Sequence, residues 1–125
     1  MKGMMHVIVK ERKSPDFIQR MEALLRRLPA SHSKRVLIEN DLAKIKAGFR
    51  GEEAVDYFLK HLNEFTIIHD IRLAGGNDDF FQIDALLLYS NFILILEIKN
   101  ISGTIYFDSA FNQLIQIKQD NERGF

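Results

Sequence analysis

Residues 82–100 have the sequence QIDALLLYSNFILILEIKN. Ser90-Asn91 is the one polar break between two apolar runs, and a short polar break of this kind is typical of a β-hairpin turn. We therefore predict that residues 80–89 and 92–99 form two antiparallel strands. Two carboxylates and an ammonium group lie within these strands, in what otherwise has the composition of a buried hairpin.

The register of this hairpin follows from its turn. If Tyr89 faces Phe92, then Asp84 faces Glu97, and Gln82 faces Lys99. Side chains two residues apart point to the same face of a strand, so all four polar side chains project from one side of the hairpin. Directly opposed residues have Cβ atoms about 4.5–5.5 Å apart. Two carboxylates at that separation repel each other unless a cation or a proton lies between them.

Two interpretations of these charged residues remain open. In the first, Asp84 and Glu97 hold a hard divalent cation such as Mg²⁺ or Mn²⁺, which prefers oxygen ligands and keeps several waters. Lys99 then orients or deprotonates a water, or stabilises charge on a phosphoryl oxygen, which is the chemistry of phosphodiester hydrolysis. In the second, Glu97 and Lys99 form an ion pair on one face, and backbone donors satisfy Asp84.

The remaining elements are predicted from hydrophobic periodicity. Helical spacing predicts helices over residues 15–28, 33–47 and 51–62, with Gly48 ending the second helix. Strand-like composition predicts strands over residues 6–9, 65–73 and 103–107, and residues 110–119 form either a helix or a strand. These predicted elements place the chain in the α/β (α+β) class, with a central antiparallel hairpin.

The third predicted helix carries a carboxylate on its apolar stripe. Glu52 lies on the same face as Val55 and Leu59, in the first turn, where the helix dipole favours a negative charge. Glu53 and Asp56 are expected on the outward face. The position of Glu52 on the apolar stripe makes it a candidate for the site that the hairpin begins.

Composition sets limits on the class of protein. A chain of 125 residues, 46% of them hydrophobic, is long enough for one domain with a core. The chain has no cysteine, which excludes disulfides and thiolate metal sites. No apolar run is long enough for a membrane span and the start does not resemble a signal peptide, so we expect a cytoplasmic protein without membrane contact.

Charge is unevenly distributed along the chain. Residues 1–50 contain 12 Lys and Arg against 5 Asp and Glu, whereas residues 51–125 contain 5 against 12. This asymmetry indicates either a basic surface for a polyanion beside an acidic metal site, or two halves that attract each other in the folded state. Lys44, Lys46 and Arg50 are the weak candidates for contacting nucleic-acid phosphates.

The four histidines are spread over different elements without the spacing of metal ligands. We expect them to have surface or capping roles: His6, His32, His61 and His69.

Three motifs together resemble a known family. They are Gly48-Phe49-Arg50-Gly51-Glu52, then Gln82-Ile83-Asp84, then Glu97-Ile98-Lys99-Asn100 followed by Gly103. In this order, over roughly residues 40–110, they resemble the nuclease-related domain (NERD), which is assigned by similarity to the PD-(D/E)XK superfamily of restriction-endonuclease-like nucleases.

The resemblance implies a role for each matching residue. Asp84 and Glu97 would bind Mg²⁺ or Mn²⁺, with the backbone carbonyl of Ile98 as an additional ligand. Lys99 would be the catalytic lysine, and Glu52 the acidic residue on the first core helix that reaches the same centre. Gln82 would have a supporting role. The implied fold is restriction-endonuclease-like, with a mixed β-sheet of about four or five strands flanked by helices. The implied function is hydrolysis of nucleic-acid phosphodiester bonds, with DNA favoured over RNA as the partner.

The chain departs from the family pattern at its end. We expect an N-terminal helical extension over residues 1–39 that packs on the same domain, and a nuclease-like domain over residues 40–125 that is short at its C-terminus. Either the gene product is truncated or a partner covers the sheet, for example a second copy in a homodimer. The alternative function is therefore a non-catalytic nucleic-acid-binding or assembly module that keeps the fold.

Overall fold

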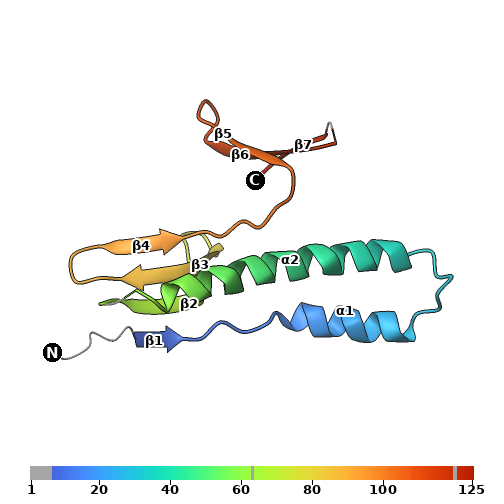
Figure 1. The fold of residues 1–125 in the computed structure, drawn as a ribbon, viewed down its shortest axis with the longest axis horizontal. Coiled ribbons are helices and arrows are strands. Elements are labelled where there is room, and N and C mark those ends of the chain that lie inside the picture. The colour runs from blue at the N-terminus through green and yellow to red at the C-terminus, as the bar shows by residue number, and fades with distance from the viewer. Residues whose placement is uncertain (1–6, 63, 120) are drawn as a thin grey trace.

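The computed structural model describes residues 7–62, 64–119 and 121–125. Its elements follow in chain order (Figure 1): β1 (Val7–Lys10), α1 (Asp16–Arg27), α2 (Arg35–Leu59), β2 (Thr66–Ala74), β3 (Phe80–Leu88), β4 (Ile93–Leu96), β5 (Thr104–Asp108), β6 (Gln113–Lys118) and β7 (Asn121–Gly124). The strands form two sheets, one with four strands and one with three.

The four-stranded sheet has the order β1-β2-β3-β4. β1 pairs with β2 in parallel, and the other neighbours are antiparallel, so the sheet is mixed. The expected α+β class with a mixed sheet is therefore confirmed. Of the residues predicted to form the first strand, His6 lies outside the described residues.

The β3–β4 hairpin has the predicted register. Leu88 pairs with Ile93, and Ala85 pairs with Leu96. β4 nevertheless ends at Leu96, so the prediction that this strand reaches residue 99 is wrong. The ladder stops where the next opposed pair would place two carboxylates against each other.

One helix replaces two that were predicted separately. α2 runs without interruption through Gly48, so the prediction that Gly48 ends a helix is wrong. A glycine in a helix interior costs only about 1 kcal/mol relative to alanine, which packing elsewhere along α2 can offset.

At Gly51 the absence of a side chain leaves room for Asn100, since a Cβ there would collide with the side chain of Asn100. The Asn100 side chain uses that approach to donate a hydrogen bond to the Ala47 carbonyl over 2.7 Å.

The core lies between the C-terminal part of α2 and one face of the sheet. Its buried members are Leu59, Phe65, Ile67, Ala85 and Leu87. Burial alternates along β3, and Asp84 belongs to the less buried set. The set that includes Asp84 continues onto β4, where Ile93 and Ile95 are 65% and 62% exposed. One face of the hairpin is therefore packed, and the other remains open.

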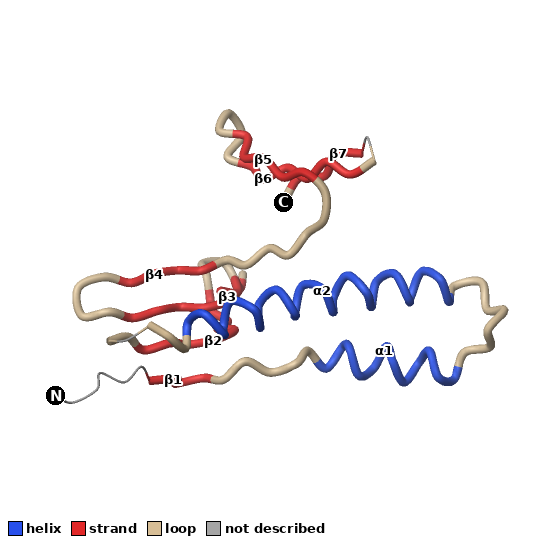
Figure 2. Tube along the Cα trace, in the orientation of Figure 1, coloured by secondary structure: helices blue, strands red, loops and turns tan. Residues whose placement is uncertain are grey.

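α1 and α2 lie side by side and extend beyond the sheet as a helical hairpin (Figure 2). The Arg35 side chain holds the two helices together by donating to the carbonyls of Leu25 and Leu28, each over 3.0 Å. Lys46 and Glu22 add an ion pair of 2.5 Å. The predicted boundary between residues 39 and 40 falls inside α2, and the division into an extension and a domain stays a prediction.

The second sheet has the order β5-β6-β7 and is antiparallel throughout. The segment 110–119, predicted as a helix or a strand, contains β6, and β7 was not predicted. Residues 97–103 connect this sheet to the first one (Figure 1).

Candidate active site

Asp84 ends the pairing between β3 and β4. Its Oδ2 accepts a hydrogen bond from the backbone N–H of Ile98 over 2.8 Å. That bond takes the place of the next ladder bond, so the chain turns away from β3 after Leu96. The observed ladder ends at the pair Ala85–Leu96, one position before Asp84 and Glu97, so the predicted opposition of these two carboxylates stays a prediction.

Glu97 and Lys99 contact each other at the open end of the hairpin. The Lys99 Nζ lies 2.8 Å from the Glu97 Oε1, and the two side chains are 40% and 55% exposed. This contact is the ion pair of the second interpretation, and the bond from Ile98 supplies the backbone donor that it requires for Asp84. A partly exposed pair of this kind contributes at most about 1 kcal/mol, so it exchanges readily for another partner.

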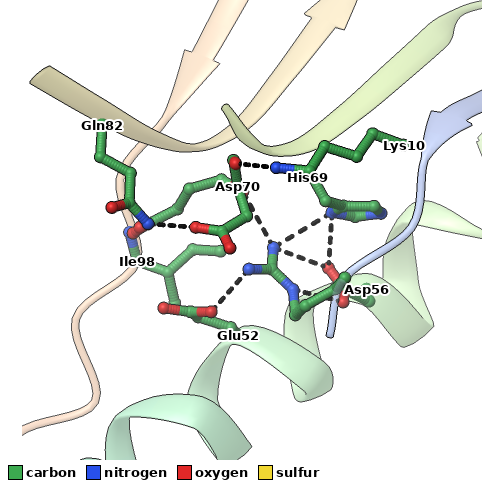
Figure 3. A network of polar contacts seen from close by, with 9 residues as sticks. Lys10, Glu52, Asp56, His69, Asp70, Gln82 and Ile98 are labelled. Atoms are coloured by element: carbon green, nitrogen blue, oxygen red, sulfur yellow. Dashed lines mark hydrogen bonds and ion pairs between the residues drawn. The ribbon is translucent and has the colours of Figure 1, made fainter. Parts of the chain in front are cut away.

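A buried guanidinium lies beside these residues. The side chain of Arg12, from the loop between β1 and α1, is only 5% exposed. It lies 2.5 Å from the Glu52 carboxylate and 2.7 Å from the Asp56 carboxylate, both on α2. It also contacts the Nδ1 of His69 at 3.1 Å and donates to the backbone carbonyl of Asp84 over 3.0 Å. Arg12 therefore connects α2, β2 and β3 in one network, whose polar contacts Figure 3 shows.

Sequence reasoning missed Arg12 and misplaced Asp56. Asp56 was expected to look outward, yet its side chain is only 17% exposed. The sequence feature that indicates such a network is the spacing of Glu52 and Asp56. Residues four apart share one helix face, and two carboxylates there repel each other unless a cation lies nearby. Nothing in the local pattern around Arg12 identifies it as that cation.

The charges in this network shift the ionisation of its members. Burial alone would lower the pKa of Arg12, but the hydrogen bond and charge of Asp56, with the charges of Glu52 and Asp84, raise it above its ordinary value. Burial raises the pKa of Glu52, against the opposing charge of Arg12, and the carboxylates of Asp84 and Asp70 raise it further. Burial is therefore the main reason that the pKa of Glu52 lies above its ordinary value, although Arg12 is beside it.

Asp70 is a second residue that the sequence did not single out. It lies on β2 between His69, which pairs with Ala85, and Ile71, which pairs with Ile83, so its position is opposite Asp84. Its φ of 52° falls in the left-handed region, where backbone strain is common near functional sites.

Side chains on both neighbouring strands hold Asp70. Gln82 donates to the Asp70 carboxylate, and the Lys10 Nζ donates to its backbone carbonyl over 2.5 Å (Figure 3). Gln82, predicted to have a supporting role, thus contacts Asp70.

The donor chemistry of the site fits a hard divalent cation. Its candidate ligands are carboxylate and carbonyl oxygens, and Mg²⁺ usually takes only one or two protein carboxylates and fills the rest of its shell with water and substrate. Within the described residues, no set of three or more Asp, Glu or His side chains converges on one point. Glu52 is paired with Arg12, Glu97 is paired with Lys99, and the Asp84 carboxylate accepts the hydrogen bond from Ile98.

The candidate phosphate-binding residues differ in their surroundings. Lys44 and Arg50 are exposed on α2. Lys46 is engaged by Glu22, so its charge is already compensated. Lys44 also lines a hollow between α2 and the second sheet.

The histidines split between two environments. His32 and His61 are exposed, in agreement with the expected surface roles. His69 is 3% exposed, so the expectation is wrong for this residue. Burial lowers the pKa of His69 and outweighs the opposing charge of Asp56, so the neutral ring that accepts a hydrogen bond is favoured. His6 lies outside the described residues.

Within the described part of the chain, neither α1 nor α2 combines the length and hydropathy that a membrane-spanning helix requires.

Comparison with known proteins agrees with the three motifs. The nuclease-related domain (NERD) model matches residues 47–124, which run from the middle of α2 to the end of β7. Neither the curated proteins nor the solved structures include a match. The matched segment contains Glu52, Asp84, Glu97 and Lys99, whereas Arg12 lies before it. Since the match covers more than half of the chain, the protein belongs to the nuclease-related domain family.

Proposed function

We propose that the protein is a divalent-metal-dependent nuclease that hydrolyses phosphodiester bonds of nucleic acid. The observation that carries the proposal is the register of β3 and β4. It directs Asp84 and the Glu97–Lys99 pair to the same open end of the hairpin, inside the segment that matches the nuclease-related domain. Two carboxylates with an adjacent ammonium are the donor types that this chemistry uses.

Asp84, Glu97 and the backbone carbonyl of Ile98 would hold Mg²⁺ or Mn²⁺. Such an ion, when bound, supplies a Lewis acid and an activated water. In the geometry described, Glu97 would exchange its contact with Lys99 for the ion, and this would free the ammonium group of Lys99. Lys99 would then orient the attacking water or stabilise charge on the phosphoryl oxygens.

Glu52 would act from the rim of the site. Its carboxylate is held by Arg12, whose guanidinium also donates to the carbonyl of Asp84. Arg12 thereby fixes the distance between α2 and β3, and it compensates part of the charge that Glu52 brings. Gln82 would support the site through Asp70, the residue opposite Asp84.

We propose nucleic acid as the partner, with DNA favoured over RNA, and phosphate contacts from Lys44 and Arg50. Lys46 is the weakest of the three candidates because Glu22 already engages it.

A nuclease assay on linear, circular and single-stranded DNA and on RNA, each with Mg²⁺ and with Mn²⁺, examines both activity and substrate class. We expect cleavage by the wild type, loss of cleavage in Lys99→Ala, and unchanged cleavage in the exposed control Lys34→Ala. Equal cleavage by wild type and Lys99→Ala would contradict the proposal.

A second candidate function has its own support. Asp84 is satisfied by the N–H of Ile98, and Glu97 is paired with Lys99, so both carboxylates have partners without an ion. This geometry favours a non-catalytic binding or assembly module with the same fold. Binding of nucleic acid without cleavage, under all the ion conditions above, would support the module.

A homodimer is also proposed, because the open face of the hairpin is apolar. Ile93 and Ile95 are exposed on β4, which is an edge strand. Exposed apolar edges tend to associate. Sedimentation equilibrium should show a dimer that Ile95→Lys converts to a monomer, and a monomeric wild type at high concentration would refute it.

A further inference from the structure

A hollow lies between α2 and the second sheet. Its volume is about 580 Å³. α2 contributes Lys44 and Ala47 to one side, the connecting segment contributes residues 100–102, and the β6–β7 hairpin forms the other side. We call this hollow the basic groove.

Cations line the basic groove. Lys44, Lys118 and Arg123 contribute to its walls, and none of its described lining residues is acidic. The strand register explains the charge of the hairpin wall. Arg123 pairs with Gln116, so both point to the face that carries Lys118. The acidic Glu122 falls on the opposite face.

Two hydrogen bonds fix the connecting segment to the walls of the groove. Asn100 donates to the carbonyl of Ala47 on α2 over 2.7 Å, and Gln116 of β6 donates to the carbonyl of Ser102 over 2.5 Å. The close approach of Asn100 requires glycine at position 51. Both walls are therefore anchored to the segment that carries Lys99 and Asn100.

One end of the groove adjoins the proposed catalytic lysine. The ring of Phe125 lines the groove, with the Arg123 guanidinium 5.0 Å from its centroid and the Lys99 ammonium 5.9 Å from its centroid. An aromatic ring beside a track of cations is typical of proteins that bind single-stranded nucleic acid, where a base stacks on the ring. A duplex, whose bases are already stacked, gains nothing from such a ring.

We infer that the basic groove binds the sugar–phosphate backbone of a single strand of nucleic acid and leads it to Lys99. Lys44, Lys118 and Arg123 contact phosphates, and Phe125 stacks with a base. The inference rests on the proposed nuclease function and deepens it, since it names the form of the substrate and its path to the site.

Fluorescence anisotropy with a labelled, mixed-sequence single-stranded DNA 12-mer tests the inference in EDTA, where no cleavage occurs. The groove variant is Lys118→Ala/Arg123→Ala. Its matched control is Arg20→Ala/Arg27→Ala, which removes two exposed cations from α1. Loss of two phosphate contacts to a single strand makes the negative slope of log K against log salt shallower by about 1.4 and weakens binding about 25-fold at 0.1 M salt. The control should bind like the wild type.

A second variant tests the groove without changing the three-stranded sheet, which Lys118→Ala/Arg123→Ala could destabilise. Lys44→Glu changes the opposite wall on α2, and Arg20→Glu is its control. Weakened binding in both groove variants, with unchanged controls, supports the inference. Equal binding by groove and control variants, no binding by the wild type, or duplex bound as tightly as the single strand each overturns it. Because the assay contains no divalent ion, loss of metal binding at Asp84 and Glu97 would refute the nuclease and leave this result unaffected.

Discussion

Replacing Arg12 with methionine is the sharpest perturbation that the structure offers. The change keeps most of the apolar volume of the side chain and removes its charge and its donors. Glu52 and Asp56 then lie one turn apart on the same face of α2 without a cation, and the carbonyl of Asp84 and the ring of His69 lose a donor. Each of these groups is at least partly buried, so water replaces the lost contacts incompletely.

The expected cost follows from the burial of the pair. Removing one partner of a buried ion pair costs about 3–5 kcal/mol, because it leaves an uncompensated charge. Arg12 is 5% exposed, but Asp56 and Glu52 are 17% and 27% exposed, so the lower end of this range applies. We expect the free energy of unfolding to fall by about 3 kcal/mol, and the melting temperature by about 10 °C.

Urea denaturation followed by circular dichroism measures this change. Arg20→Met is the matched control, since Arg20 is exposed on α1 and its loss should cost no more than about 0.5 kcal/mol. Adding Asp56→Asn to Arg12→Met removes one orphaned charge. The double variant should therefore recover at least about 1 kcal/mol relative to the sum of the single changes.

Two results would contradict a stabilising role for Arg12. A loss in Arg12→Met no larger than that in Arg20→Met would show that the guanidinium contributes nothing to stability. Strict additivity of Arg12→Met and Asp56→Asn would show that the two groups do not interact in solution.

Two further predictions concern α2 and its neighbours. Gly51→Ala should lower the free energy of unfolding by about 1–3 kcal/mol, because the new Cβ collides with Asn100. Gly48→Ala has open space around it and should raise the free energy of unfolding by up to about 1 kcal/mol. Equal effects of the two changes in urea denaturation would refute the packing of Asn100 against Gly51. His69 has a folded pKa below its ordinary value because burial outweighs the charge of Asp56, so its contribution to stability is complete above pH 6.5 and is lost as pH falls through the folded pKa. The loss of stability between pH 7.5 and 5.5 should be smaller in His69→Gln than in the wild type, and an equal or larger loss would contradict this.

The hairpin could be predicted because its information is local. The polar break at residues 90–91 between two apolar runs fixes the register, which the structure shows from Leu88–Ile93 to Ala85–Leu96. The end of β4 could not be predicted, because it depends on a side chain. The Asp84 carboxylate takes the N–H of Ile98, and no pattern of hydrophobicity records such a bond.

The errors on α2 have a common cause in long-range packing. Glycine at position 48 is a helix breaker by composition, but the segments packed along α2 outweigh its small cost. Asp56 was placed outward because its neighbours along the helix are polar. Its partner, Arg12, comes from a loop 44 residues earlier. The burial of His69 depends on the same loop, so a pattern within one element could not reveal it.

Calorimetric titration of Mn²⁺ into the protein measures whether Asp84 and Glu97 hold a divalent ion. The wild type should bind Mn²⁺ with measurable heat, and Asp84→Asn/Glu97→Gln should lose that heat. The control Asp41→Asn/Glu53→Gln, which removes two exposed carboxylates on α2, should bind like the wild type. Negligible binding by the wild type, or equal binding by the wild type and the Asp84→Asn/Glu97→Gln variant, would contradict a metal site at Asp84 and Glu97.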